Sequence, residues 1–131
     1  MKRVLLDAIA SPADVRKVPE EQLDDLASEV RQELLDVISQ RGGHLASNLG
    51  VVELTIALLH EFELPTDTLV WDTSHQTYAY KLLTGRRELF RSLREYGGCS
   101  GFQNMEESPL DAFGAGHAGT AISAAVGMAG V

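Results

Sequence analysis

Apolar residues recur at every third or fourth position across residues 23–37, with charged and polar residues between them. This spacing predicts an amphipathic helix, because residues three or four apart lie on one face of a helix. Gly42 and Gly43 predict its end. Before it, Ser11 followed by Pro12 predicts a short helix, since serine caps a helix and proline suits the first turn. The apolar stripe of the longer helix consists of Leu23, Leu26, Val30, Leu34 and Val37.

A second helical pattern, residues 49–62, is apolar on two faces, which predicts a helix buried on both sides. One face carries Val51, Leu54, Leu58 and Phe62, and the other carries Val52, Ile56 and Leu59. Residues 76–83 predict a further helix that stops at a threonine–glycine pair. From Thr120 onward, small apolar residues predict a helix that packs closely against a sheet.

Two short apolar runs predict strands. Residues 69–72 suit a central strand of a parallel sheet, which is covered on both faces, and residues 110–113 predict a second strand. Strand, glycine-rich turn and helix in succession are typical of α/β proteins, in which ligands lie at the carboxyl ends of the strands. Residues 96–109 predict a long loop, and loops of that length are usually functional. The predicted fold class is therefore α/β, with parallel strands and flanking helices.

Composition and charge limit the kinds of partner that the chain can bind. The 131 residues suit one small domain, and the net charge of -8 argues against nonspecific nucleic-acid binding, which needs a basic face. We also expect no membrane partner, because no apolar stretch is long enough to span a bilayer. The single cysteine, Cys99, excludes an internal disulfide and indicates a reducing, cytoplasmic compartment. Nothing nearby activates its thiol, so we interpret it as an unreactive loop residue.

Three histidines, His44, His75 and His117, lie in or beside predicted loops with glycine, serine or threonine neighbours. Each alone is more often a capping or hydrogen-bonding residue than a catalyst. Together they can converge on one cleft, where neutral imidazoles bind phosphate or hydroxyl oxygens and relay protons. Their separations fit no local metal motif, so we assign no metal ligand. The fourth histidine, His60, ends a helical pattern and is interpreted as structural.

The glycine-rich turn at residues 114–119 formally matches G-x-G-x-x-G. A dinucleotide site also needs an acidic residue about 20 positions later, beyond this chain, so the match is weak evidence. Glycines do let a backbone approach a ligand, and a helix N-terminus attracts anions. A phosphate-bearing cofactor and a tight turn without a ligand both remain open. Elsewhere, Arg86 and Arg87 are interpreted as a solvated helix end, and Trp71 as core.

From about Leu5 to its last residue, the chain resembles the 1-deoxy-D-xylulose-5-phosphate synthase family, which is transketolase-like. The most specific signature within that larger group is His-Gln-x-Tyr together with Leu-Thr-Gly-Arg-Arg. The matching stretches are Gly43-His44-Leu45-Ala46-Ser47-Asn48-Leu49-Gly50, Trp71-Asp72 with His75-Gln76-Thr77-Tyr78, Lys81-Leu82-Leu83-Thr84-Gly85-Arg86-Arg87, Gly97-Gly98 with Gly101-Phe102, and Gly116-His117 with Thr120.

The resemblance implies the fold and chemistry of that family. Its members use thiamine diphosphate and Mg²⁺ to decarboxylate pyruvate and join the two-carbon unit to D-glyceraldehyde 3-phosphate. The product, 1-deoxy-D-xylulose 5-phosphate, feeds isoprenoid, thiamine and pyridoxal biosynthesis. Residues 1–42 then form an N-terminal helical segment, and residues 43–131 form the first part of a three-layer, thiamine diphosphate-binding α/β domain. The full-length parent is expected to be a homodimer.

By the same resemblance, His44 is catalytic and assists proton transfer or acceptor binding near the reacting carbons. The resemblance also implies that thiamine diphosphate is contacted by His75, Gly116, His117 and Ala118. The Mg²⁺ motif, Gly-Asp-Gly with a later Asn, and the activating glutamate are expected beyond Val131. We therefore expect a truncated chain that is inactive alone. A partner-binding remnant and another transketolase-like enzyme are the alternatives.

Three positions depart from the family pattern. Ser74 stands where glycine is usual and places a Cβ at a tight turn. Gly119 follows Ala118 where the family has Ser-Ser or Ala-Ser. Asn48 occupies a position where glycine or serine is common. These departures are expected to change affinity or to mark a divergent member.

Overall fold

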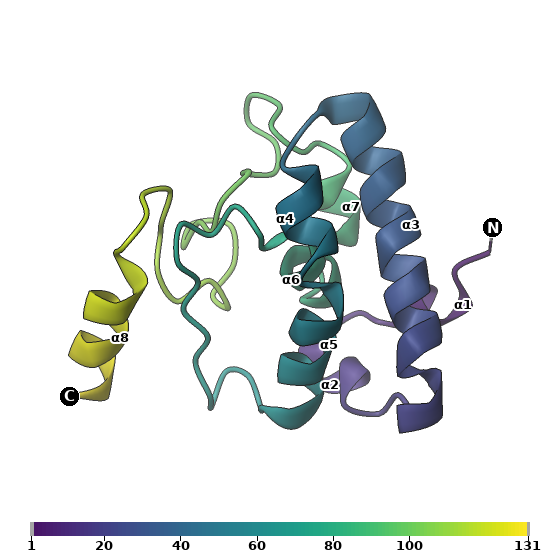
Figure 1. The fold of residues 1–131 in the computed structure, drawn as a ribbon, viewed down its shortest axis with the longest axis horizontal. Coiled ribbons are helices and arrows are strands. Elements are labelled where there is room, and N and C mark those ends of the chain that lie inside the picture. Colours follow the sequence, from purple (N-terminus) through teal and green to yellow (C-terminus); the bar gives the residue numbers. More distant parts are fainter. Residues whose placement is uncertain (1, 131) are drawn as a thin grey trace.

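The computed structural model describes residues 2–130, and all of their regular structure is helical (Figure 1). The prediction of an α/β fold with a parallel sheet is therefore wrong for residues 2–130, which contain no strand. The elements are α1 (Val4–Asp7), α2 (Pro12–Val15), the 3₁₀ helix η1 (Glu20–Gln22), α3 (Leu23–Arg41), α4 (Leu45–Leu49), α5 (Val52–Glu61), α6 (Tyr78–Leu83), α7 (Arg87–Phe90) and α8 (Ala121–Ala129).

The two runs predicted as strands, residues 69–72 and 110–113, are irregular instead. A strand is stable only when its backbone N–H and C=O groups pair with a neighbouring strand, and no such neighbour exists within the described residues. Trp71 is nevertheless buried, with its ring centroid 5.9 Å from that of Tyr80. The apolar pattern thus predicted burial of Trp71 correctly but assigned the wrong secondary structure.

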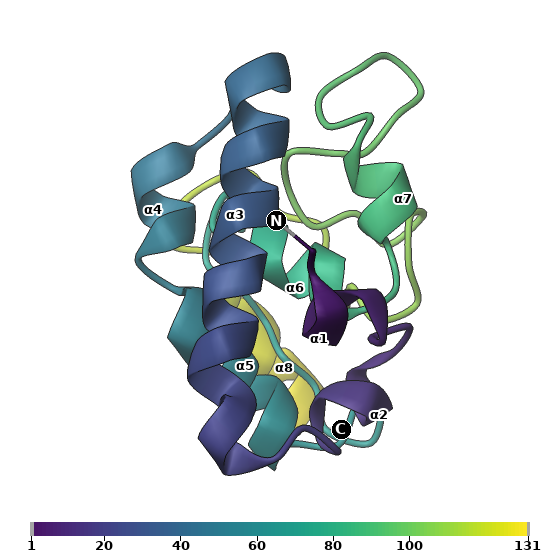
Figure 2. The ribbon, with the colours of Figure 1, turned by 90° about the vertical axis from the view of Figure 1, so that its right-hand side faces the viewer.

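The predictions for the first two helices are confirmed. The carboxylate of Asp14 accepts hydrogen bonds from the backbone N–H groups of Ala10 and Ser11, both at 3.0 Å, which fixes the start of α2. In α3 the apolar stripe faces inward, and Gly42 ends the helix with φ of 76°. Figure 2 shows α3 as a long helix in front of α6.

The second helical pattern is broken near Gly50 into α4 and α5, which packs against α2, α3 and α6. Those neighbours bury one stripe of α5, formed by Val52, Ile56 and Leu59. On the other stripe Leu54 is 52% exposed and Phe62 is 45% exposed. The prediction of a helix buried on both faces is therefore wrong, because Leu54 and Phe62 of the second face remain exposed within residues 2–130, although Leu58 packs against the core.

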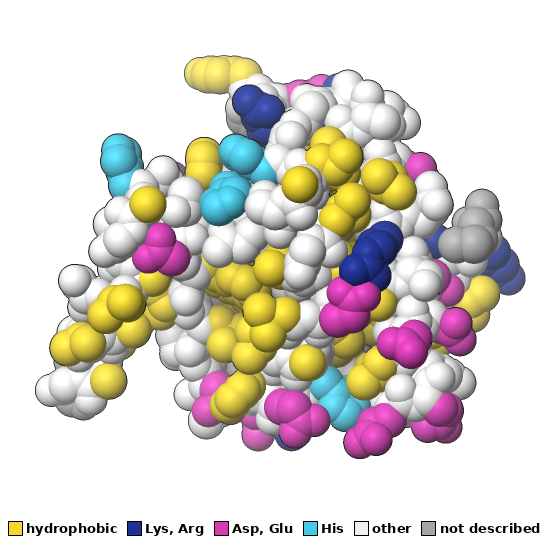
Figure 3. Space-filling model, viewed as in Figure 1, with side chains coloured by type: hydrophobic (Ala, Val, Ile, Leu, Met, Phe, Trp, Pro, Cys, Tyr) yellow, Lys and Arg dark blue, Asp and Glu magenta, His cyan; other side chains and the backbone are white. Residues whose placement is uncertain are grey.

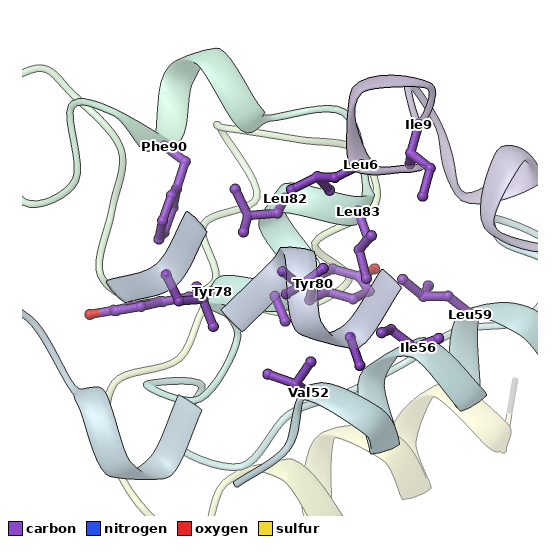
Figure 4. Close-up of a cluster of buried hydrophobic side chains, with 14 of the residues drawn as sticks. Leu6, Ile9, Val52, Ile56, Leu59, Tyr78, Tyr80, Leu82, Leu83 and Phe90 are labelled. Carbon is purple, nitrogen blue, oxygen red and sulfur yellow. The ribbon is translucent and has the colours of Figure 1, made fainter. Parts of the chain in front are cut away.

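The core is built around α6, in which Tyr78 and every following residue to Leu83 are buried (Figure 4). Leu6 lies on one side of α6, and Ile56 of α5 lies on the opposite side (Figure 4). Side chains from before and after Gly42 therefore share one hydrophobic cluster. The division into segments 1–42 and 43–131 stays a prediction.

The last helix, α8, lies at the edge of the molecule, apart from α3 (Figure 1). The predicted helix after Thr120 is confirmed, but its predicted close packing against a sheet is wrong. Only Ala121 is buried, whereas Ile122 is 77% exposed and Val126 is 68% exposed. Within residues 2–130, no helix has both the length and the apolar character needed to cross a membrane.

Candidate functional site

Two of the three predicted site histidines meet at one place. His44 is the N-cap residue of α4, and His75 follows the turn that leads into α6. Their ring centroids are 5.2 Å apart at an interplanar angle of 68°, an edge-on contact. The ring of Phe102, from the long loop, lies 6.1 Å from that of His44. Figure 3 shows histidine side chains gathered on the upper part of this face. The sequence prediction that the motifs converge holds for this pair.

Asn48 connects the two histidine segments, a function that the sequence analysis did not foresee. Its side-chain nitrogen donates hydrogen bonds to the carbonyl oxygens of His44, at 2.6 Å, and His75, at 2.8 Å. Its side-chain oxygen accepts a hydrogen bond from the backbone N–H of Tyr78 at 2.9 Å. Asn48 is fully buried. In the sequence, Asn48 stood out only as a departure from the family pattern, which did not indicate these hydrogen bonds.

The turn before His75 has an unusual backbone. Thr73 and Ser74 both have positive φ, 58° and 69°, a region that side chains with a Cβ rarely adopt. Ser74 is buried, and its hydroxyl accepts a hydrogen bond from the backbone N–H of Gln103 at 2.9 Å. Ser74 thus combines backbone strain with a hydrogen bond to the long loop.

Asp72 joins this turn to the glycine-rich segment before α8. Its carboxylate accepts hydrogen bonds from the backbone N–H groups of Gly119, at 2.9 Å, and Ala121, at 3.3 Å. The hydrogen bond from Gly119 is the main reason that the pKa of Asp72 lies below its usual value. Asp72 therefore holds the N-terminus of α8 beside the His75 turn.

The glycine-rich segment itself is open. Gly116 and Gly119 have φ of 152° and 83°, and a Cβ added at either would meet nothing within 4 Å. His117 and Ala118 are exposed, and no ring contact within residues 2–130 joins His117 to the other histidines. The segment follows no strand, so it lacks the structural context of a dinucleotide fingerprint.

Gly43 allows the His44 segment to lie on the core. It has φ of 144°, and a Cβ at this position would lie 3.0 Å from ring and hydroxyl atoms of Tyr78. The Tyr78 hydroxyl accepts a long hydrogen bond, 3.4 Å, from the backbone N–H of His44. The other end of the ring packs edge-on against Phe90, at 5.5 Å between centroids. Tyr78 therefore connects the core to the site.

A buried ionic cluster holds the long loop. The Glu107 carboxylate accepts hydrogen bonds from Lys81 at 2.7 Å and from Arg86 at 3.0 Å. Arg86 also binds both oxygens of Asp111, at 2.7 and 2.8 Å. The Lys81 ammonium donates to the carbonyl oxygen of Phe102 at 2.8 Å, next to the site. The interpretation of Arg86 as a solvated helix end is wrong, because it is buried in this cluster.

The cluster also changes proton affinities. Burial alone would raise the pKa of Glu107, but hydrogen bonds from Lys81 and Ser100 lower it below its usual value. Burial is the main reason that the pKa of the Cys99 thiol rises to about 11. A thiol with so high a pKa carries little thiolate near neutral pH, which agrees with the interpretation of Cys99 as an unreactive residue.

Several polar atoms beside the histidine pair are free to bind a polar group. His75 Nδ1, Gln76 Oε1 and both side-chain polar atoms of Gln103 are buried without a hydrogen-bond partner among residues 2–130. Together with the open glycine segment, they fit a ligand that offers hydrogen-bonding groups. No group of three or more His, Cys, Asp or Glu side chains in the described part of the chain is arranged to hold a metal ion.

Comparison with known proteins gives one consistent family. Residues 6–131 match the family model described as 1-deoxy-D-xylulose-5-phosphate synthase. Enzymes of that name are similar to this chain in Dehalococcoides mccartyi (58% identical over 125 residues), Methylacidiphilum infernorum (57% over 125) and Geobacter sulfurreducens (58% over 125). Each alignment covers 95% of this chain and 20% of the relative. The chain thus spans about a fifth of the length of these relatives.

Proposed function

Because the chain belongs to the 1-deoxy-D-xylulose-5-phosphate synthase family, we propose that it supplies the N-terminal part of an active site for that reaction. In this reaction pyruvate loses carbon dioxide, and its two-carbon unit joins D-glyceraldehyde 3-phosphate to give 1-deoxy-D-xylulose 5-phosphate. The observation that carries the proposal is the contact between His44 and His75, whose rings lie 5.2 Å apart within the family's motifs.

The residues proposed to hold thiamine diphosphate are His75 and the segment Gly116, His117 and Ala118. When bound, this cofactor stabilises the carbanion that the reaction requires. His75 Nδ1 is buried and free to bind a polar atom, and the backbone around Gly116 is open to close approach. The proposed Mg²⁺ ligands belong to other parts of the full-length enzyme.

His44 is proposed to move a proton or to bind the acceptor substrate. Its side chain is exposed beside that of His75, so a substrate can reach it. An imidazole changes its charge near neutral pH, which suits general acid–base catalysis, and the wall of the site at Phe102 is apolar.

The decisive test is a chimera in which this chain replaces the matching fifth of a full-length relative. We expect an active chimera in which His44→Ala lowers kcat by roughly 10²–10⁴-fold, the usual contribution of a general acid or base. His75→Ala should instead raise the thiamine diphosphate concentration needed for half-maximal activity. His60→Ala is the matched control, because the His60 ring contacts the carbonyl oxygen of Val18, a residue far from it in sequence. Full activity of the His44→Ala chimera would contradict the proposal.

We further propose that the 131-residue chain alone is inactive and that the full-length enzyme is a homodimer. The small share of the relatives that the chain covers supports the first point. Calorimetric titration with thiamine diphosphate and Mg²⁺ tests it, and micromolar binding by the isolated chain would contradict it.

A further inference from the structure

We propose that Asn48 is a positioning residue that sets how the His44 and His75 rings face each other. The inference rests on the proposed function, in which His44 acts on the substrate and His75 contacts the cofactor. Asn48 acts through the backbone of both histidines, because its hydrogen bonds go to their carbonyl oxygens.

The geometry lets Asn48 bind the backbone of both histidine segments. One NH₂ group donates to two carbonyl oxygens that are 31 residues apart in sequence, counted from His44 to His75. Both bonds, at 2.6 and 2.8 Å, are short for an amide donor, whereas the backbone N–H of His44 reaches the Tyr78 hydroxyl at only 3.4 Å. The Asn48 amide therefore binds the His44 backbone more closely than the Tyr78 hydroxyl does.

The third hydrogen bond orients the amide. The oxygen of Asn48 accepts the N–H of Tyr78, the first residue of α6, and such first-turn N–H groups have no partner within their own helix. With its oxygen fixed on α6, the NH₂ group must point to the two carbonyls. α6 belongs to the buried core, and Asn48 links it to the backbones of both histidines. The fixed position of α6 therefore restricts the positions of His44 and His75.

In this chain, the three hydrogen-bond partners of this position fit the side chain of asparagine. Aspartate has the same shape but accepts only, so it would place a carboxylate against two carbonyl oxygens. Serine has one donor and cannot bind both carbonyls. Glutamine carries the same amide on a longer side chain, and its extra methylene would have to fit into a fully buried, closely packed place.

Nuclear magnetic resonance of the intact chain tests the inference without cofactor. In the unmodified chain we expect a ring-to-ring nuclear Overhauser effect between His44 and His75. We also expect both side-chain amide protons of Asn48 to exchange more slowly with solvent than those of exposed Gln40. Rapid exchange of the Asn48 amide protons would overturn the proposal, whatever happens to any variant.

Two variants separate positioning from simple stabilisation. Asn48→Asp and Asn48→Ala should lose the ring-to-ring signal while the Trp71 indole resonance of the core keeps its position. Thr55→Ala is the matched control, because Thr55 is also fully buried and its hydroxyl donates at 2.7 Å to Val51 within its own helix. It should lower stability and keep the signal. Persistence of the signal in Asn48→Asp would overturn the inference, and this result would leave the proposed reaction untouched.

Discussion

At the scale of single residues, the His75 turn combines strain with specific hydrogen bonds. Thr73 and Ser74 adopt backbone angles that cost free energy for residues with a Cβ. Such strain persists only where the surroundings compensate for it, and here the Ser74 hydroxyl holds Gln103. Ser74 therefore has a specific structural partner in the long loop.

Substitutions at Ser74 should separate these two effects. Ser74→Ala keeps the strained Cβ and leaves the buried N–H of Gln103 without an acceptor, which should lower the unfolding free energy by about 1–3 kcal/mol. Ser74→Gly loses the same bond but removes the strain, so it should be more stable than Ser74→Ala by about 1 kcal/mol. Urea unfolding followed by Trp71 fluorescence gives both values. The reverse order of the two variants would show that the backbone there is not strained.

Asp72 should make the attachment of α8 depend on pH. Its pKa is lowered from an ordinary value of 3.8, mainly by the N–H of Gly119. A lowered folded-state pKa means that the stabilisation is present above the unfolded value and is lost as the pH falls through the folded value. The chemical shift of the Gly119 amide proton should therefore titrate with a midpoint below the ordinary aspartate value of 3.8. In Asp72→Asn this titration should vanish, and a shift that persists there would assign it to another group.

At the scale of elements, the long loop is held by buried charges. Their contribution to the free energy of unfolding can be measured. Asp111→Asn leaves Arg86 buried with only part of its counter-charge, so it should lower the unfolding free energy by about 3 kcal/mol. Glu53→Gln is the control at an exposed pair with Arg31, where the loss should be at most about 1 kcal/mol. Urea unfolding compares them. Equal losses of unfolding free energy in the two variants would mean that burial of the cluster adds nothing to its contribution to stability.

The sequence predicted those elements whose pattern depends on local contacts. The stripe of α3 and the proline start of α2 follow from spacing and caps, and both are confirmed. The run at residues 69–72 could not be assigned from its own residues, because strand formation depends on a partner elsewhere in space. The hydrogen bonds of Asn48 and Arg86 to distant residues were not foreseen for a related reason, since these partners lie 21–30 residues away in sequence.

At the scale of the whole molecule, one face is unusually apolar. Figure 3 shows hydrophobic side chains in the middle of the face and on α8. The exposed members on α5 and α8 include Leu54, Ile122 and Val126. Large exposed apolar side chains of this kind promote association.

The isolated chain should therefore self-associate as its concentration rises. Replacing Ile122→Glu together with Val126→Lys adds a favourable pair one turn apart on α8 and removes two exposed apolar side chains. This double variant should sediment as a monomer at concentrations where the parent does not. Its unfolding free energy should stay within about 0.5 kcal/mol of the parent's, because both side chains face solvent. A parent that is monomeric throughout analytical ultracentrifugation would contradict the expectation.

The contact between Gly43 and Tyr78 has a consequence for how such sequences can change over time. A side chain at position 43 would meet both a strained backbone and the tyrosine ring. A larger residue there would need a smaller one at position 78, which would loosen the packing on Phe90, and the backbone strain at position 43 would remain. Positions 43, 78 and 90 should consequently change together in related sequences. Substitutions in the core are then limited by the need to keep His44 in its place at the surface.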